Sequence, residues 1–303
     1  MSVLRLALIQ MQSEADARDE NVAKACRYID EVAEEKPDLI VLPEFFNHEY
    51  VFQYRDYAYM DCAEPETGHT ITTIRAKAIE HRTTICATIF EEQGPGLFFD
   101  TAFFIGPDGE IFGKYRKTHP AAVQSLEKIY FRGGTQFPTV NVKGFRVGAI
   151  ICYDHCFPET VRCATINGAE IVLGPFAAPR FPAWDHLMIT RAWENGVYMA
   201  PCNKVGLEGE WVFGGRSLIV DPFGEIVAQA SDDSDDTIIT EISRERVYAA
   251  RRRWPMLRDR RPEVYGPLTS SDEAARGLLV ATTTCDDELV PLGEKSPARV
   301  GDN

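Results

Sequence analysis

The chain has 303 residues and a formal net charge of −14, from 46 acidic and 32 basic residues. Hydrophobic residues make up 45% and charged residues 26%, a globular balance that allows a sizeable core. The charge argues against nucleic-acid binding, which needs a basic face. No apolar run approaches the roughly 20 residues that span a bilayer, and the first residues lack a signal peptide's basic region and cleavage site. We therefore expect a soluble, cytoplasmic protein that binds neither nucleic acid nor membrane.

Strands and helices alternate along most of the chain. Apolar runs predict strands, whereas apolar residues spaced three and four apart predict amphipathic helices. The expected strand segments are residues 3–11, 37–44, 83–92, 98–117, 137–152, 171–175, 197–206, 214–230 and 236–242. The expected helices are residues 18–35, 69–82, 156–170 and 184–196. Gly-containing turns after residues 106, 142 and 221 divide three of the strand segments into hairpins. This mixture predicts one α/β domain with mixed sheets.

The pattern stops near Thr269. We expect one domain over residues 1–268, followed by a C-terminal tail over residues 269–303 that is mobile or docked on a neighbouring subunit. A basic cluster at residues 251–263 also contains aromatic and acidic residues. We interpret this cluster as a salt-bridged segment rather than a nucleic-acid patch.

The eight cysteines raise the question of metal or disulfide chemistry, above all the pair Cys152 and Cys156 in GAIICYDHCFPE. The chain has no CxxC, and its six histidines are scattered. A thiol zinc site needs two close pairs or a Cys pair with a His pair, so we expect no metal. Most of the thiols are expected to be buried and reduced.

Three polar side chains stand at the ends of apolar strands: Glu44 after LIVLP, Lys117 after IFGKYR and Cys152 after FRVGAII. Each has an ordinary interpretation, as a cap or surface acid, a solvated lysine and an inert buried thiol respectively. Together they suit a hydrolase, with the carboxylate as general base for the thiol and the ammonium facing a developing oxyanion.

Three motifs containing these residues are specific in combination. LPEFF, GKYRKTHP and ICYDHCFPE, in this order and spacing, resemble the signatures of the nitrilase superfamily of carbon–nitrogen hydrolases. The resemblance extends over residues 4–268 and includes the segments 191–206, 215–228 and 258–268. It implies a four-layer α-β-β-α sandwich of two mixed β-sheets, an enzyme without metal or organic cofactor, and assembly into homodimers or larger homo-oligomers.

The resemblance also implies roles for individual residues. Glu44 is the general base, Lys117 stabilises the oxyanion, and Cys152 is the nucleophile that forms a thioester. Glu127, in SLEKIYFRGG, matches a second, positioning glutamate of the catalytic set. The backbone N–H of Tyr153 completes the oxyanion hole.

Within the superfamily, the chain is most similar to carbamoylase-type amidohydrolases, and its RDRRPEVYGPL segment resembles that of N-carbamoylputrescine amidases. The expected substrate is a small N-carbamoyl amine or N-carbamoyl amino acid. His155 and Cys156 stand where N-carbamoyl-D-amino acid amidohydrolases carry two arginines, so a bidentate contact with a substrate carboxylate is missing there. His155 either meets an anion or makes a structural hydrogen bond.

Tyr153 and Trp184 are candidate substrate contacts, although aromatic residues in such places also serve in packing. Three alternatives remain open: an ω-amidase or other aliphatic amidase, a nitrilase using the same residues, and an inactive relative that acts as a binding protein. The intact set of Glu44, Lys117, Glu127 and Cys152 argues against the last.

Overall fold

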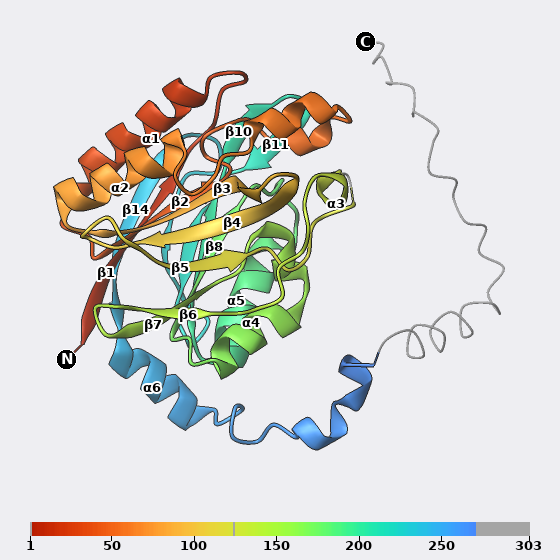
Figure 1. Cartoon of the computed structure of the whole chain (residues 1–303). Helices are drawn as coiled ribbons and strands as arrows, with labels where there is room; N and C mark the ends of the chain where they lie inside the picture. Colours follow the sequence, from red (N-terminus) through yellow and green to blue (C-terminus); the bar gives the residue numbers. More distant parts are fainter. Residues whose placement is uncertain (1, 124, 271–303) are drawn as a thin grey trace, which may run out of the picture. The chain divides into compact units, whose positions relative to one another are not determined.

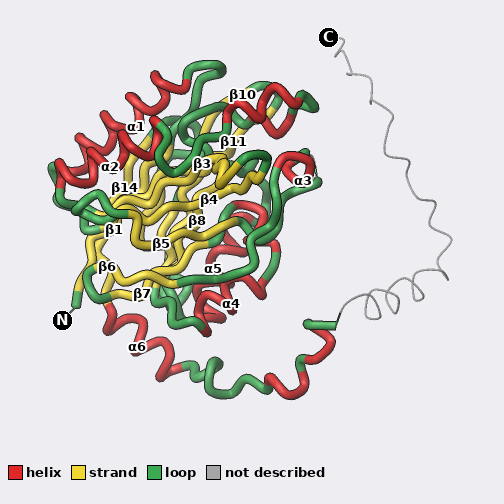
Figure 2. Tube along the Cα trace, viewed as in Figure 1, coloured by secondary structure: helices red, strands yellow, loops and turns green. Residues whose placement is uncertain are grey.

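The computed structural model of the protein describes residues 2–123 and 125–270, drawn in Figures 1 and 2. The chain divides into two compact units at Arg258 and Asp259, and the first unit contains all of the sheets. The described part of the second unit holds two short 3₁₀ helices, Pro262–Val264 and Gly266–Leu268. The predicted C-terminal tail lies outside the described residues beyond residue 270.

Two mixed six-stranded sheets form the centre of the first unit. The first sheet has the order β14 (Asp236–Ser243), β1 (Val3–Gln10), β2 (Leu39–Glu44), β3 (Thr84–Gly94), β4 (Leu97–Ile105) and β5 (Ile111–Arg116). The second has the order β13 (Ile226–Gln229), β12 (Leu218–Val220), β9 (Tyr198–Asn203), β8 (Ile171–Phe176), β7 (Phe145–Ala149) and β6 (Thr139–Val142). In the first sheet β1, β2 and β3 are parallel, and in the second sheet β7, β8 and β9 are parallel. The other strands of each sheet pair antiparallel with their neighbours.

Helices cover the outer face of each sheet. Figure 1 shows α1 (Arg18–Ala33) and α2 (His69–His81) on one side of the strands, and α4 (Pro158–Ile166) and α5 (Trp184–Asn195) on the other. Figure 2 shows the same arrangement, with helices outside and strands between them. The predicted four-layer α-β-β-α sandwich is therefore confirmed.

The central parallel strands are apolar along their whole length because both of their faces are covered. Every residue of β2, β8 and β9 is buried. One core cluster joins the facing sides of the two sheets with α4 and α5, and a second lies between the first sheet and α1 and α2. This packing brings the ends of β2 and β7 into one region of the molecule and fixes the site described below.

Some elements differ from the prediction. Residues 197–206 do not form one strand, because β9 ends at Asn203 and a separate hairpin follows, β10 (Val205–Glu208) with β11 (Trp211–Gly214). A helix that was not predicted, α6 (Arg244–Arg253), follows β14, and it buries only Val247 and Ala250. Among the described residues, no helix is long and apolar enough to cross a membrane.

Candidate active site

The polar residues at the strand ends converge on one buried ammonium. Glu44 is the last residue of β2, and Lys117 follows β5 directly. The Lys117 Nζ atom lies 2.7 Å from Glu44 Oε1 and 2.7 Å from Glu127 Oε2, and all three side chains are fully buried. Burial alone would lower the pKa of Lys117, but Glu127 and then Glu44 raise it well above its usual value. The lysine is therefore an ammonium at neutral pH.

Three groups hold the Glu127 carboxylate. It is the first residue of the short helix α3 (Glu127–Tyr130). Its Oε1 atom accepts hydrogen bonds from Tyr50 Oη at 2.6 Å and from Lys117 Nζ at 2.9 Å, and its Oε2 atom accepts one from the backbone N–H of Ala121 at 2.7 Å. Both carboxylate oxygens are thus occupied, and the geometry suits a positioning group better than a base.

Glu44 is bound differently. Its Oε1 atom accepts from Lys117, but its buried Oε2 atom accepts from no N–H group or hydroxyl among the described residues, and the Asp100 carboxyl group lies within hydrogen-bonding distance of the side chain. A buried carboxylate oxygen without a donor is costly, and such atoms are common where a substrate or a reacting proton is received. Of the two glutamates, Glu44 is therefore the one with fewer donors, and it is the better placed to accept a proton.

Cys152 stands at a strained turn. It opens the 3₁₀ helix Cys152–Cys156 just after β7 and has a φ of +39°, in the left-handed region that non-glycine residues rarely adopt. Phe45, the residue after Glu44, also lies there, with a φ of +52°. Burial, and next the Glu44 carboxylate, raise the pKa of the Cys152 thiol well above its usual value, against the opposing effect of Lys117. The resting sulfur is therefore a thiol that needs a base.

Asp154 connects the cysteine turn with the lysine loop. Its fully buried carboxylate accepts hydrogen bonds from Tyr115 Oη at 2.6 Å, from the backbone N–H of Ile151 at 3.0 Å and from the backbone N–H of His119 at 3.0 Å. Ile151 directly precedes Cys152, and His119 is two residues beyond Lys117. Asp154 thus holds two parts of the site in register with one side chain.

A third carboxyl group, Asp100, lies beside the buried ammonium. The ladder between β4 and β5 places it opposite Lys117, whose backbone N–H donates to the Asp100 carbonyl at 2.9 Å. The Asp100 Oδ2 atom is 3.4 Å from Lys117 Nζ, and the Asp100 carboxyl group lies within hydrogen-bonding distance of the Glu44 side chain. Three ionised carboxylates around one lysine would leave two negative charges uncompensated. Burial, and then Glu44, raise the pKa of Asp100 well above its usual value, so it holds a proton.

This assignment predicts how Asp100→Asn changes stability with pH. In the unfolded chain an aspartate ionises near pH 3.9, whereas the folded chain keeps the proton to a higher pH. The folded state then binds one proton more, so its stability falls as the pH rises. The variant lacks this loss. We therefore expect its free energy of unfolding, relative to that of the wild type, to be at least about 1 kcal/mol more favourable at pH 7.5 than at pH 5. Urea unfolding at both values measures the difference, and a difference that stays constant or shrinks would show that Asp100 is ionised.

A cavity of about 290 Å³ opens at Cys152. Two of the predicted substrate contacts, Tyr153 and His155, line it together with Glu127. Trp184 does not lie among its lining residues. It packs against Phe176 and Phe181, and its indole N–H donates to the carbonyl of Arg216 at 3.1 Å. The structure therefore places Trp184 behind the cavity wall.

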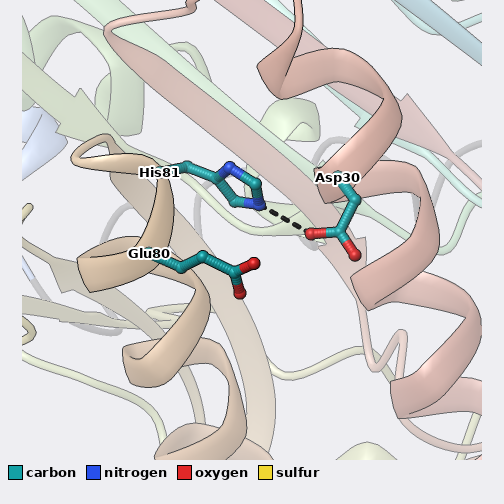
Figure 3. Close-up of side chains that lie close together, drawn as sticks. All are labelled: Asp30, Glu80 and His81. Carbon is teal, nitrogen blue, oxygen red and sulfur yellow. Dashed lines mark hydrogen bonds and ion pairs between the residues drawn. The ribbon is translucent and has the colours of Figure 1, made fainter.

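One group of side chains in the described part of the chain has the spacing of a metal site. Figure 3 shows Asp30 from α1 with Glu80 and His81 from α2, and the His81 Nε2 atom is 2.6 Å from Asp30 Oδ1. Lys77 already pairs with both acids, 2.7 Å from Asp30 and 2.9 Å from Glu80. The group is an ion-pair cluster that joins two helices, away from Cys152.

Sequence reasoning missed Asp100, Asp154 and Tyr50. The signal for Asp100 was present, because an acid interrupts the apolar strand FFDTAFF. Asp154 lies between the two cysteines that drew attention, and no pattern marks it. Tyr50 lies in a segment without regular periodicity, so no spacing indicates that its hydroxyl reaches Glu127.

A buried thiol at a cavity, close to a buried carboxylate–ammonium pair in an α-β-β-α sandwich, defines a hydrolase of carbon–nitrogen bonds other than peptide bonds. The chain belongs to the carbon–nitrogen hydrolase family, whose model matches residues 5–252. The resemblance seen in the three motifs is thereby confirmed.

The chain is similar to several members of this family along nearly their whole length. It is 32% identical to the N-carbamoylputrescine amidase of Oryza sativa subsp. japonica over 85% of this chain and 92% of the relative. It is 30% identical to the human omega-amidase over 88% and 98% of the two chains. The crystal structure of a carbon–nitrogen hydrolase from Helicobacter pylori G27 superposes with a TM-score of 0.83, with 27% identity over 89% of this chain and 99% of that one.

Proposed function

We propose that the protein is a cysteine-dependent amidohydrolase that cleaves a small N-carbamoyl amine or N-carbamoyl amino acid and releases the amine, carbon dioxide and ammonia. The observation that carries the proposal is the proximity of a buried, strained Cys152 thiol to the Glu44 carboxylate, which is itself paired with one buried ammonium. The similarity to an N-carbamoylputrescine amidase supports the choice of the carbamoyl group.

The proposed reaction has two steps. Glu44 takes the proton of the Cys152 thiol, and the sulfur attacks the carbonyl carbon while Lys117 Nζ and the N–H of Tyr153 receive the oxyanion. The C–N bond breaks, and Glu44 returns the proton to the departing ammonia. Water, deprotonated by Glu44, then attacks the thioester, which frees a carbamic acid that decays to amine and carbon dioxide.

The other residues of the site are positioning groups in this scheme. Glu127, held by Tyr50 and the N–H of Ala121, fixes Lys117 Nζ from one side, while Glu44 fixes it from the other. A preorganised ammonium stabilises a developing oxyanion without the cost of reorienting solvent.

Amide hydrolysis without a carbamoyl group is the second candidate function. The 30% identity to an omega-amidase supports it, and the same residues would act on a primary amide. A nitrilase reaction would also use them. The complete set, with Lys117 paired to Glu44 and Glu127 and all three acting on the pKa of Cys152, favours an enzyme over an inactive binding protein.

An ammonia-release screen over carbamoyl amines, carbamoyl amino acids, ω-amides and nitriles tests the proposal. We expect carbamoyl compounds to be turned over with the highest kcat/KM, with one amine formed for each ammonia released. A higher kcat/KM for ω-amides would move the assignment to the second candidate. A preference for nitriles, or activity lost on adding a chelator, would contradict the proposed metal-free amidohydrolase.

We also propose that the protein acts in the cytoplasm as a homodimer or larger homo-oligomer. Free thiols at Cys26, Cys62, Cys86, Cys152, Cys156 and Cys202 suit a reducing compartment. Two half-exposed indoles, Trp193 on α5 and Trp254 after α6, lie with ring centroids 6.0 Å apart, and such exposed aromatic pairs are typical of interfaces.

A further inference from the structure

The cavity at Cys152 is lined mainly by apolar side chains. Its volume of about 290 Å³ is at the small end of ligand sites. The apolar lining residues come from several loops, from α5 and from the β10–β11 hairpin: Ala121, Val123, Ala177, Ala178, Pro179, Phe181, Leu187 and Trp211. A substrate group that enters this cavity therefore loses its contacts with water and gains contacts mostly with apolar side chains.

The only acid among the described lining residues has no capacity left for a substrate cation. Glu127 already accepts hydrogen bonds from Lys117, Tyr50 and the backbone N–H of Ala121, and its charge is compensated by the Lys117 ammonium at 2.7 Å. An ammonium group on the substrate would have to compete with a fully buried lysine for the same oxygens.

The one ionisable base among the described lining residues is neutral. His155 Nδ1 lies 2.5 Å from the carbonyl oxygen of Cys152, so this nitrogen carries the ring proton and donates it. The other nitrogen, Nε2, is 3.6 Å from the thiol sulfur of Cys156. Burial, and then the cations Arg191 and Lys117, lower the pKa of His155. His155 therefore offers no positive charge to a substrate carboxylate.

The arginines around the cavity are engaged elsewhere. Arg180 pairs with Asp232 at 2.7 Å, and Arg216 donates to Asp185 at 2.7 Å. Arg191 donates to the carbonyl of His155 at 3.3 Å and pairs with Glu194 at 3.2 Å. None of these three is among the residues that line the cavity.

We infer that the group attached to the scissile carbonyl is uncharged and apolar, so that the substrates are neutral alkyl or aryl ureas and amides rather than carbamoyl amino acids, ω-amides with a carboxylate, or carbamoyl diamines. This inference rests on the proposed function and on its amide alternative, and it narrows the substrates of both. A carboxylate or ammonium buried in this cavity would lose its hydration and gain no partner of opposite charge.

Three isosteric substrate pairs test the inference. Pentylurea is compared with N-carbamoylputrescine, (3-methylbutyl)urea with 3-ureidopropanoate, and 4-methylpentanamide with succinamate. In each pair a methyl or isopropyl group replaces a charged group of similar shape. We expect kcat/KM to be at least about a hundredfold higher for the neutral member of each pair.

The outcomes separate the inference from the proposed function. Cys152-dependent turnover that favours the charged members would overturn the inference and leave the function standing. Turnover that survives Cys152→Ala would overturn the function. Failure to hydrolyse any of the six compounds would overturn the inference. The proposed function would then be tested separately, by whether an acyl group forms on Cys152.

A charge placed in the cavity provides a second test. Cys156 is an exposed lining residue, so Cys156→Arg introduces a cation without disturbing the core. We expect this variant to shift the ratio of kcat/KM for 3-ureidopropanoate over (3-methylbutyl)urea upward by at least about tenfold, relative to the matched variant Cys156→Ser. An unchanged ratio would show that the charge of the lining does not select the substrate.

Discussion

Replacing Cys152 by alanine is expected to lower kcat by at least about ten-thousand-fold, because no other described thiol lies among the groups around Lys117. The rest of the site would stay in place, since Asp154 holds the turn through the N–H of Ile151 and does not use the sulfur. We therefore expect the free energy of unfolding to change by less than about 1 kcal/mol. Ammonia release and urea unfolding of the same preparation measure the two quantities.

The matched control is Cys62→Ala. Cys62 is half-buried at the end of the 3₁₀ helix Tyr57–Cys62 and does not line the cavity. It should retain wild-type activity within about twofold. A Cys152→Ala enzyme that keeps more than about one hundredth of the wild-type kcat would show that the thiol is not the nucleophile.

Replacing Lys117 by methionine is expected to have the largest effect on stability. The ammonium lies 2.7 Å from Glu44, 2.7 Å from Glu127 and 3.4 Å from Asp100, and all four side chains are fully buried. Removing one partner of a buried ion pair costs about 3–5 kcal/mol, because the remaining charge is left without compensation. We expect a loss of stability in that range together with the loss of activity.

Two variants separate the electrostatic cause from general damage. Adding Glu127→Gln to Lys117→Met removes one carboxylate that has lost its cation. The double variant should therefore recover part of the lost stability but none of the activity. Lys143→Met breaks an ion pair with Asp38 in which the lysine is 54% exposed, and it should cost no more than about 1 kcal/mol. A Lys117→Met protein as stable as the wild type would mean that the buried carboxyl groups are uncharged.

The strand ends were predictable because polarity changes sharply there. Glu44 follows five buried residues of β2, and Cys152 follows the buried end of β7 and Ile150 and Ile151. Parallel strands of a sandwich place such ends at one edge, so the meeting of Glu44, Lys117 and Cys152 followed from the fold class. The position of Glu127 did not follow from periodicity and rested on the family motif alone.

The direction of individual side chains, and which charged groups face one another, could not be predicted from the sequence. Trp184 opens α5, but its ring turns toward Phe176 and Phe181 behind the cavity wall, a choice made by packing rather than by spacing. Asp100 is an acid in an apolar strand, and only the ladder with β5 shows that it faces Lys117. The helix α6 has a short apolar face of two buried residues, which is too weak a pattern to separate from a polar loop.

Acid quenching during turnover of 4-methylpentanamide tests most directly whether the reaction passes through a thioester on Cys152. The peptide that contains Cys152 should carry one 4-methylpentanoyl group, removable by hydroxylamine, while the peptides that contain the other cysteines stay unmodified. Turnover at the wild-type rate with no acyl group on Cys152, or with the acyl group on another residue, would contradict the proposed mechanism.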